Sequence, residues 1–558
     1  MEAADVVVVG GGSAGAVMAA RLSEDAGRKV VLLEAGQDTP PGSVPADIAD
    51  TFPTSFFNRD YFWTNQTGAM RLGEPQRPFL QPKVMGGGSS VMGMIALRGL
   101  ATDYDRWAAM GATGWGWRDV EPAFSALTHD LDADPRGKNQ PGPYIIGRLP
   151  RQTWPAYMHR MEAAAGRRGM PAVEDVYTTE ADAFFPLPMS HDDTRSTTAR
   201  CYLDAAARAR PNLRIVSRAQ VERVLLDGRR VRGVAVRIDG STHEIAAREV
   251  VISAGALNSP ALLQRSGIGD PEMLMRAGVT PLVELPAVGR NYQNHVLLHF
   301  ALTLEPNSQL RPEQRHYVLT GMRASSGVTG CPAGDLFIFL IGRVAPRSFG
   351  VRMGMVAVAL NQPFSRGSVN IASADPDTAP ICEQALLSDP RDAQRMLIAT
   401  RLAEGLILEP GVRACWREAY LLPREAPLRL INGTGIIGAA KALGASAALA
   451  APAAVRKRIM AHAIAPGRLV ADRNSHQPLT DAEILAASGS MFHPSGSCRM
   501  GSADHPETVV DPQCRVIGVD GLSVVDASVM PCLPSANTNL PTIMIAERAA
   551  EMMRRRLA

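Results

Sequence analysis

The chain has 558 residues, of which 46% are hydrophobic and 20% are charged, and its formal net charge is +3. This length is too great for one ordinary hydrophobic core, so it predicts two domains of globular composition. The sequence has no basic stripe with interleaved aromatic residues and gives no support to nucleic-acid binding.

The chain starts with "MEAADVVVVGGGSAG", an acidic start followed by four valines and a glycine run. A signal peptide has a basic start and a longer apolar stretch, so we expect none. No run reaches the ~18 consecutive apolar residues of a membrane span. The seven cysteines are irregularly spaced without a CxxC pair, so neither a disulfide framework nor a metal site is expected. Reduced thiols predict a cytoplasmic protein.

The first forty residues predict a strand, a helix and a second strand, with a glycine loop after the first strand. Residues 6–9 are a continuous run of valines, typical of a strand buried on both faces. A helix is predicted over residues 16–23. A second apolar strand, residues 30–33, is followed directly by Glu34.

The glycine loop between the first strand and the helix has the spacing G-x-G-x-x-G. Gly10 allows a tight turn, Gly12 lets the backbone approach a pyrophosphate, and Gly15 lets the helix pack close to the strand. The start of the helix offers free N–H groups to phosphates. Glu34 lies where a carboxylate accepts ribose hydroxyls, and a glutamate there disfavours a 2′-phosphate. The segment therefore predicts a site for FAD or NAD rather than NADP.

A second glycine-serine loop, "KVMGGGSSVMGMIALRG", occupies residues 83–99. Either it aims further backbone donors at a cofactor, or it is only a tight turn. Residues 211–238 then alternate like paired strands and lead into a buried strand at 250–253.

An alanine-rich segment at residues 430–470 predicts helix. Its basic residues Arg456, Lys457 and Arg458 would suit a membrane surface. We favour a helical lid or a buried hairpin over the active site, so peripheral membrane contact is disfavoured.

The C-terminal stretch "MFHPSGSCRMG", residues 491–501, holds a histidine, a cysteine and an arginine within seven residues. Its spacing alone leaves four roles open: a metal site, a redox thiol, a core segment or proton transfer. A later stretch, "VVDASVMP" at 524–531, reads as an apolar strand that ends at Asp526. That aspartate would contact a cofactor, cap the following turn, or do both.

Together these motifs resemble those of the glucose–methanol–choline (GMC) family of flavin oxidoreductases. The resemblance covers nearly the whole chain, and the stretches "MRASSGV" and "LLSDPRD" favour the 5-(hydroxymethyl)furfural oxidase and aryl-alcohol oxidase group. The matching motifs are the glycine loop and residues 87–90, 98–99, 103–107, 250–269, 288–295, 493–501, 524–531 and 535–542.

The resemblance implies an α/β fold with FAD as cofactor. We expect a Rossmann-type FAD-binding domain and a substrate-binding domain built on an antiparallel sheet with helices. The FAD-binding domain would combine residues 1–100, 195–300 and 485–558, and the substrate domain residues 101–194 and 301–484.

The resemblance also implies the site residues. His493 is expected to be the catalytic base, with Asn537 as a hydrogen-bond donor to the substrate oxygen. Met92 departs from the asparagine or histidine common at its position, so FAD is expected to be bound without a covalent link. The expected cofactor-binding residues are Gly10, Gly12, Ser13, Ala14, Gly15, Glu34, Ala35, Gly87, Ser89, Ser90, Met92, Val221, Asp526, Ala527, Asn537 and Thr538.

The function implied is oxidation of a primary alcohol, aromatic or furanic, to the aldehyde. Hydride would pass to flavin N5 and the proton to His493, with O₂ as the oxidant that restores the flavin. One alternative is a dehydrogenase that acts on aliphatic or polymeric alcohols with a quinone-type acceptor. Another is a hydroxynitrile-type lyase in which FAD is redox-silent.

Overall fold

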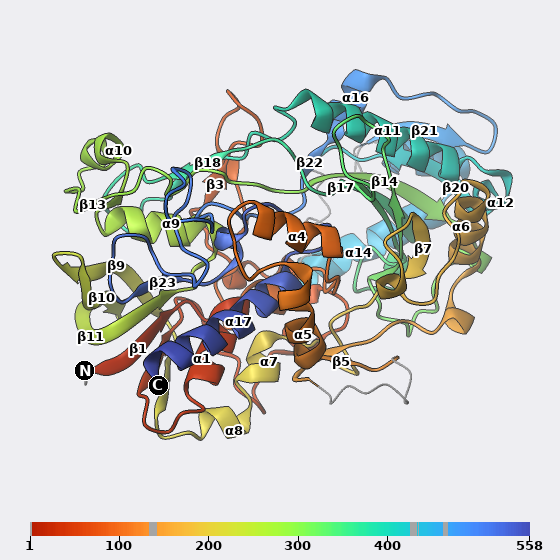
Figure 1. Ribbon diagram of the computed structural model, residues 1–558. Coiled ribbons are helices and arrows are strands. Elements are labelled where there is room, and N and C mark those ends of the chain that lie inside the picture. Colours follow the sequence, from red (N-terminus) through yellow and green to blue (C-terminus); the bar gives the residue numbers. More distant parts are fainter. Residues whose placement is uncertain (1–2, 133–141, 425–431, 433–434, 461–466) are drawn as a thin grey trace.

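The computed structural model describes residues 3–132, 142–424, 432, 435–460 and 467–558. Two β-sheets dominate it. Figure 1 shows the sheet that contains β1 and β9–β11 on the left and the sheet that contains β14, β17 and β20 on the right. This mixed α/β architecture confirms the fold class expected from the sequence.

The first sheet has seven strands in the order β8–β2–β1–β11–β10–β9, and β23 pairs with β11. The strands are β1 (Ala4–Val9), β2 (Val30–Leu33), β8 (Leu213–Val216), β9 (Ala219–Asp227), β10 (Arg230–Ile238), β11 (Ser241–Ile252) and β23 (Leu522–Val524). Strand β1 pairs in parallel with both β2 and β11. The predicted strands at residues 6–9 and 30–33 are confirmed, and both are buried because sheet strands flank them.

The predicted buried strand at 250–253 is the final part of the longer β11. The first half of β11 runs antiparallel to β10, and its second half runs parallel to β1. One strand therefore joins the antiparallel and parallel parts of the sheet, which places its end beside the end of β1.

Helix α1 spans Ser13–Leu22 and begins three residues earlier than predicted. Gly12 has extended backbone geometry and forms the N-cap, so the loop ends there. Gly15 consequently lies in the first turn of the helix, not in the loop.

The second sheet has eight strands, and its pairings are antiparallel among the residues described. Its order is β21–β20–β14–β17–β16–β15–β7, and β22 pairs with β14. The strands are β7 (Ala183–Pro186), β14 (Val296–Leu304), β15 (Val318–Ala324), β16 (Leu336–Ile341), β17 (Met353–Leu360), β20 (Trp416–Leu421), β21 (Arg468–Asp472) and β22 (Gly489–Ser490).

The longer helices pack against these sheets. They are α4 (Ala101–Ala109), α5 (Trp117–Leu127), α6 (Ala156–Arg167), α9 (Gly255–Arg265), α11 (Pro390–Ile407), α14 (Gly435–Ala450) and α17 (Asn539–Leu557). Helix α11 packs on the second sheet, whereas the aromatic residues of α4 and α5 join the core of the first. The division into domains stays a prediction, since α4 and α5 lie in a piece assigned to the substrate domain.

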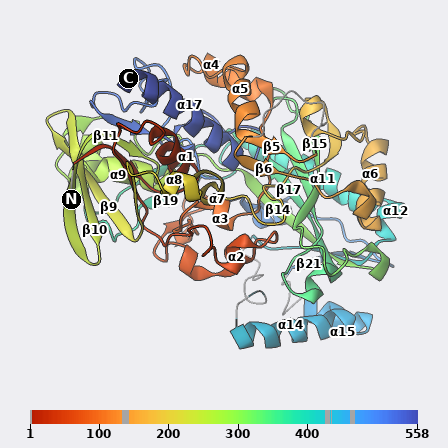
Figure 2. The ribbon, with the colours of Figure 1, turned by 90° about the horizontal axis from the view of Figure 1, so that it is seen from below.

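The alanine-rich segment forms α14 and α15 (Ala453–Ile459), while residues 430, 431, 433, 434 and 461–466 lie outside the described part of the chain. Figure 2 shows both helices at one edge of the molecule. Helix α15 is held by its basic side chains: Arg456 forms a buried ion pair with Glu418 of β20 at 2.6 Å, and Lys457 pairs with Asp472 of β21. These two residues are therefore engaged within the chain.

Candidate active site

A central pocket lies where the ends of β1 and β11 meet the start of α1 and the C-terminal segment. Its lining includes Gly10, Gly12, Ser13, Ala14, Glu34, Ala35, Gly87, Ser89, Met92, Val221, His493, Asp526, Ala527, Asn537 and Thr538. Gly15 and Ser90 are the predicted site residues that lie outside this lining. The pocket thus gathers residues from both ends of the chain.

The glycine loop brings backbone atoms closer together than a side chain would permit. Gly10 has a φ of +96°, and a Cβ at Gly15 would overlap the carbonyl oxygen of Gly10. Gly87, with a φ of +52°, would place a Cβ 2.9 Å from the Cα of Gly12. The two glycine loops therefore meet backbone to backbone at the wall of the pocket.

Glu34 fixes the loop that surrounds it. Its carboxylate accepts hydrogen bonds from the backbone N–H groups of Gly11 and Gly36, both at 2.7 Å. Burial raises the pKa of Glu34, while these two N–H groups lower it. Each carboxylate oxygen keeps a further lone pair with which a ligand hydroxyl can bond.

The second glycine loop is held from behind by Arg195, which is almost fully buried. Its guanidinium donates to the carbonyl oxygens of Ser89 and Met92, at 3.1 and 2.8 Å. Ser90 is equally internal, since its hydroxyl donates to the carbonyl of Met85. Ser90 therefore shapes the loop and does not face the pocket.

Helices α1 and α17 run parallel, with both N-termini at the pocket. Ser13 at the start of α1 donates to Asn539 at the start of α17, at 2.6 Å. Eight residues further along each helix, Arg21 pairs with Glu547 at 2.9 Å. Two positive helix ends therefore converge on one place, which favours a negatively charged ligand.

Asp526 lies at the turn after β23. Its carboxylate accepts from the backbone N–H of Gly255 and Ser528 and from the hydroxyl of Ser259. The aspartate caps the 3₁₀ turn Ala527–Val529 and also lines the pocket. The sequence leaves open whether Asp526 caps the turn or faces a cofactor. In the structure the same side chain caps the turn and faces the pocket.

His493 lies at the other end of the pocket, where three side chains meet. Its Nε2 is 3.2 Å from Nδ2 of Asn537, and its Nδ1 is 2.8 Å from Nδ1 of His295. Burial lowers the pKa of His493 well below 6.5. Within the described chain, Oδ1 of Asn537 has no hydrogen-bond partner. This end of the pocket therefore combines a neutral imidazole with a free amide acceptor.

The run Asn291–His295 holds this arrangement together. Asn294 accepts a hydrogen bond from the backbone N–H of His493 at 2.9 Å. Gln293 forms two backbone hydrogen bonds with Ser495, and its side chain accepts from the N–H of Leu533. The run belongs to a motif of the sequence, but the motif alone assigns no role to its residues. The available signal was the placement of five polar or aromatic residues directly before an apolar strand.

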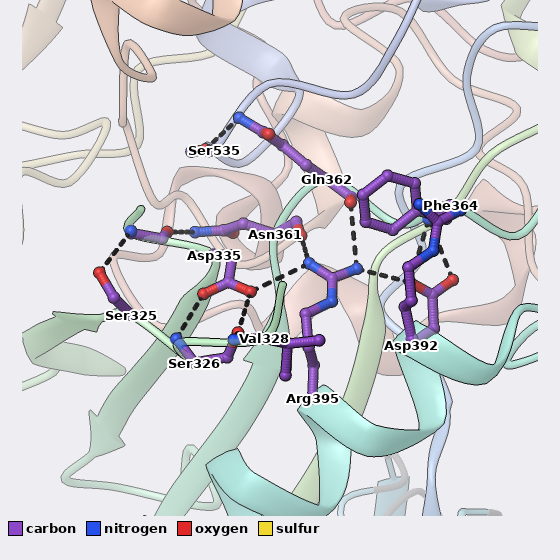
Figure 3. Close-up of polar contacts among 12 residues, drawn as sticks. Ser325, Ser326, Val328, Asp335, Asn361, Gln362, Phe364, Asp392, Arg395 and Ser535 are labelled. Carbon is purple, nitrogen blue, oxygen red and sulfur yellow. Dashed lines mark hydrogen bonds and ion pairs between the residues drawn. The ribbon is translucent and has the colours of Figure 1, made fainter. Parts of the chain in front are cut away.

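A buried polar network supports the turn that carries Asn537 (Figure 3). Arg395 forms ion pairs with Asp392 and Asp335 and donates to the carbonyl of Gln362. The amide of Gln362 in turn donates to the hydroxyl of Ser535 at 2.8 Å. These hydrogen bonds therefore connect the turn to α11, which packs on the second sheet.

The cysteine and arginine of the C-terminal stretch make internal contacts. Cys498 is fully buried, and burial raises the pKa of its thiol well above 9. Arg499 pairs with Glu507 at 2.6 Å. Among the described residues, no group of three or more metal-ligand side chains is present. Of the stretch 491–501, Phe492, His493 and Pro494 line the pocket, and His493 is the titratable residue among them.

Comparison with known proteins adds independent findings. A GMC oxidoreductase N-terminal family model matches residues 4–297, and a GMC oxidoreductase C-terminal model matches residues 363–546. The chain is 35% identical to 5-(hydroxymethyl)furfural oxidase of Methylovorus sp. (strain MP688) over 567 residues, covering 98% of each protein. It is 32% identical to oxygen-dependent choline dehydrogenase of Vibrio vulnificus (strain YJ016), covering 98% of this chain and 94% of the relative.

Among solved structures, the fold is similar to that of pyridoxine 4-oxidase from Mesorbium loti. The TM-score is 0.80, the sequence identity is 27%, and 99% of each chain is covered. The similarity therefore extends over both sheets and not only over the glycine loop.

Proposed function

The chain belongs to the GMC oxidoreductase family of FAD-dependent enzymes, and from this premise we propose that it oxidises a primary aromatic or furanic alcohol to the aldehyde. The observation that carries the proposal is the placement of His493 and Asn537, 3.2 Å apart, in the same pocket as the glycine loops. Identity of 35% over the whole chain to a 5-(hydroxymethyl)furfural oxidase supports this substrate class.

The donors and acceptors of the pocket fit FAD. The N-termini of α1 and α17 would hold the pyrophosphate, and Glu34 would accept the ribose hydroxyls. The wall formed by Val221 would lie beside the adenine. When bound, FAD supplies the acceptor for the hydride that leaves the alcohol carbon. Met92 offers no histidine nitrogen for a covalent link, so we propose that FAD is bound without one.

We assign proton removal to His493. An alcohol that gives up hydride must also lose its O–H proton, and a neutral imidazole accepts that proton through a nitrogen lone pair. Nε2 faces Asn537 and the pocket, whereas Nδ1 is engaged by His295. The amide N–H of Asn537 would donate to the substrate oxygen as the proton leaves.

The proposed electron acceptor is O₂. The match to 5-(hydroxymethyl)furfural oxidase supports an oxidase, and a quinone-linked dehydrogenase remains the alternative to be tested. Among the described residues, no helix is long and apolar enough to cross a membrane. A cytoplasmic location stays a prediction.

The test begins with the purified, yellow holoenzyme under anaerobic conditions. Addition of 5-(hydroxymethyl)furfural or benzyl alcohol should bleach the flavin, and a hydroxynitrile that leaves the colour unchanged while being cleaved would point to the lyase. Admission of air should then restore the colour and consume oxygen. Restoration only by a quinone would establish the dehydrogenase, and colourless protein that takes up no FAD would refute the proposal.

A further inference from the structure

His295 contacts the proposed base but has no function in the reaction as described so far. The Nδ1 atoms of His295 and His493 lie 2.8 Å apart, and the two rings cross at 78°. His295 is 1% exposed, and burial lowers its pKa to about 4. Because burial also lowers the pKa of His493, both rings are neutral near neutral pH.

The two neutral rings contact each other through their Nδ1 atoms. A hydrogen bond between these atoms contains one proton, which belongs to one ring or the other. If His493 donates it, its Nδ1 is protonated and its Nε2 carries a lone pair toward the pocket. If His295 donates it, the single N–H of the neutral His493 ring is at Nε2, and this nitrogen cannot accept a proton. Only the first arrangement allows His493 to act as a base.

The Asn537 amide favours the first arrangement. With that amide oriented as in the structure, its N–H group lies 3.2 Å from Nε2 of His493 and requires a lone pair there. The proton between the rings then belongs to Nδ1 of His493, and Nδ1 of His295 is the acceptor.

We propose that His295 is a positioning residue that holds His493 with Nδ1 protonated and with a lone pair, not a proton, on Nε2. This inference rests on the proposed role of His493 as base. When the alcohol O–H bond breaks and the proton bonds to Nε2, His493 becomes a cation. Its Nδ1–H still donates to His295, so the new positive charge is stabilised by a charge-assisted hydrogen bond.

A direct test reads the tautomer in holoenzyme labelled with ¹⁵N-histidine. The signals of His493 are assigned as those missing from His493→Ala. In the wild type, Nδ1 should show the shift of a protonated nitrogen and Nε2 that of an unprotonated one. In His295→Leu, the Nε2-protonated form should appear. A wild-type His493 that carries its proton on Nε2 would overturn the proposal without any variant.

Kinetics provide a second test. His295→Leu should slow anaerobic flavin reduction at saturating alcohol by about 10- to 100-fold, a range typical for loss of a group that orients a functional histidine. Its FAD content and KM should stay near those of the wild type. His295→Gln restores a carbonyl acceptor and should recover part of the rate.

His299 offers a matched control close by in the chain. It lies in β14, whose first residue directly follows His295, and is four residues and about 13 Å further along. Burial lowers its pKa to about 4 as well. His299→Gln should therefore reduce flavin at nearly the wild-type rate.

The two proposals fail in different ways. Wild-type reduction by His493→Ala would refute the base itself. Wild-type reduction by His295→Leu, while His493→Ala is impaired, would refute only the positioning role.

Discussion

The two ends of the central pocket are built from different parts of the protein. The end formed by Gly10, Gly12 and Gly87 consists of backbone atoms. These atoms can approach one another only because glycine has no side chain. At the other end the side chains of His493 and Asn537 line the pocket and His295 contacts His493, and the three residues come from separate segments. The first end requires room for close backbone contacts, whereas the second requires hydrogen bonds in a particular direction. The two ends should therefore respond differently to mutation.

The largest effect is expected at the backbone end. Gly15→Ala places a Cβ against the carbonyl of Gly10, so α1 must move away from β1. Overpacking of this kind costs about 1–3 kcal/mol or more and displaces the helix end that would hold the pyrophosphate. The variant should purify without FAD and melt at lower temperature.

The matched control for Gly15→Ala is Gly166→Ala in α6, where a Cβ meets no atom within 4 Å. That variant should keep its FAD and its melting temperature. Retention of FAD by Gly15→Ala, measured from the visible spectrum, would contradict the dependence of this end on close backbone contact.

The next largest effect is expected at the side-chain end. His493→Ala should slow anaerobic reduction of the flavin by about two to four orders of magnitude, the usual range for general-base catalysis. FAD should remain bound, because the glycine loops are unchanged. Stopped-flow absorbance measures the rate, and Cys498→Ala in the same stretch is the control that should react normally. Loss of FAD from His493→Ala would show that the two ends are not separate.

The pH dependence follows from burial. A histidine with an ordinary pKa would make the reduction rate rise near pH 6.5, but burial lowers the pKa of His493 well below that value. The neutral, reactive form is therefore complete at pH 6.5 and is lost only as the pH falls toward the lowered pKa. Reduction rates between pH 6.5 and 8 should be flat, and a steep rise within that interval would contradict this assignment.

A smaller effect is expected for Asn537→Ala. The change removes a neutral hydrogen bond to the substrate oxygen, usually worth ~0.5–1.5 kcal/mol. Flavin reduction should slow by about tenfold at the upper end of that range. If the loss equalled that of His493→Ala, Asn537 would have to act on more than the substrate.

The smallest effect is expected far from the pocket, on α15. Free basic residues near a membrane surface contribute about 1 kcal/mol each to binding anionic lipids, but Arg456 and Lys457 are already paired with Glu418 and Asp472. The protein should therefore not co-sediment with vesicles that contain phosphatidylserine. Co-sedimentation that is lost in Arg456→Ala would revive the idea of a membrane surface.

The backbone end of the pocket was predictable from sequence because its signal is local. The spacing of Gly10, Gly12 and Gly15 between a valine run and a helix predicts both the tight turn and a dinucleotide ligand. The start of α1 was placed three residues late, since nothing in the sequence indicates that Gly12 forms the N-cap. The two-sheet fold was expected only through the family resemblance.

The side-chain end was only partly predictable. The motifs identify His493 and Asn537, but the two other partners of His493, His295 and Asn294, are 198 and 199 residues away in the chain. The contacts of Asn294 and His295 with His493 both depend on how β14 pairs with β22, and a strand of two residues leaves no periodic pattern in the sequence. The direction of the hydrogen bond between His295 and His493 also requires that both rings be neutral. Burial makes them neutral, and burial cannot be read from residue type alone.

The pairing of α1 with α17 has a consequence for how the enzyme is made. Ser13 is synthesised 526 residues before its partner Asn539. Strand β23 likewise pairs with β11, which precedes it by about 270 residues in the chain. A nascent chain without α17 would therefore have only one of the two helix ends that we expect to hold the phosphates, so we expect FAD to be bound after α17 has been synthesised.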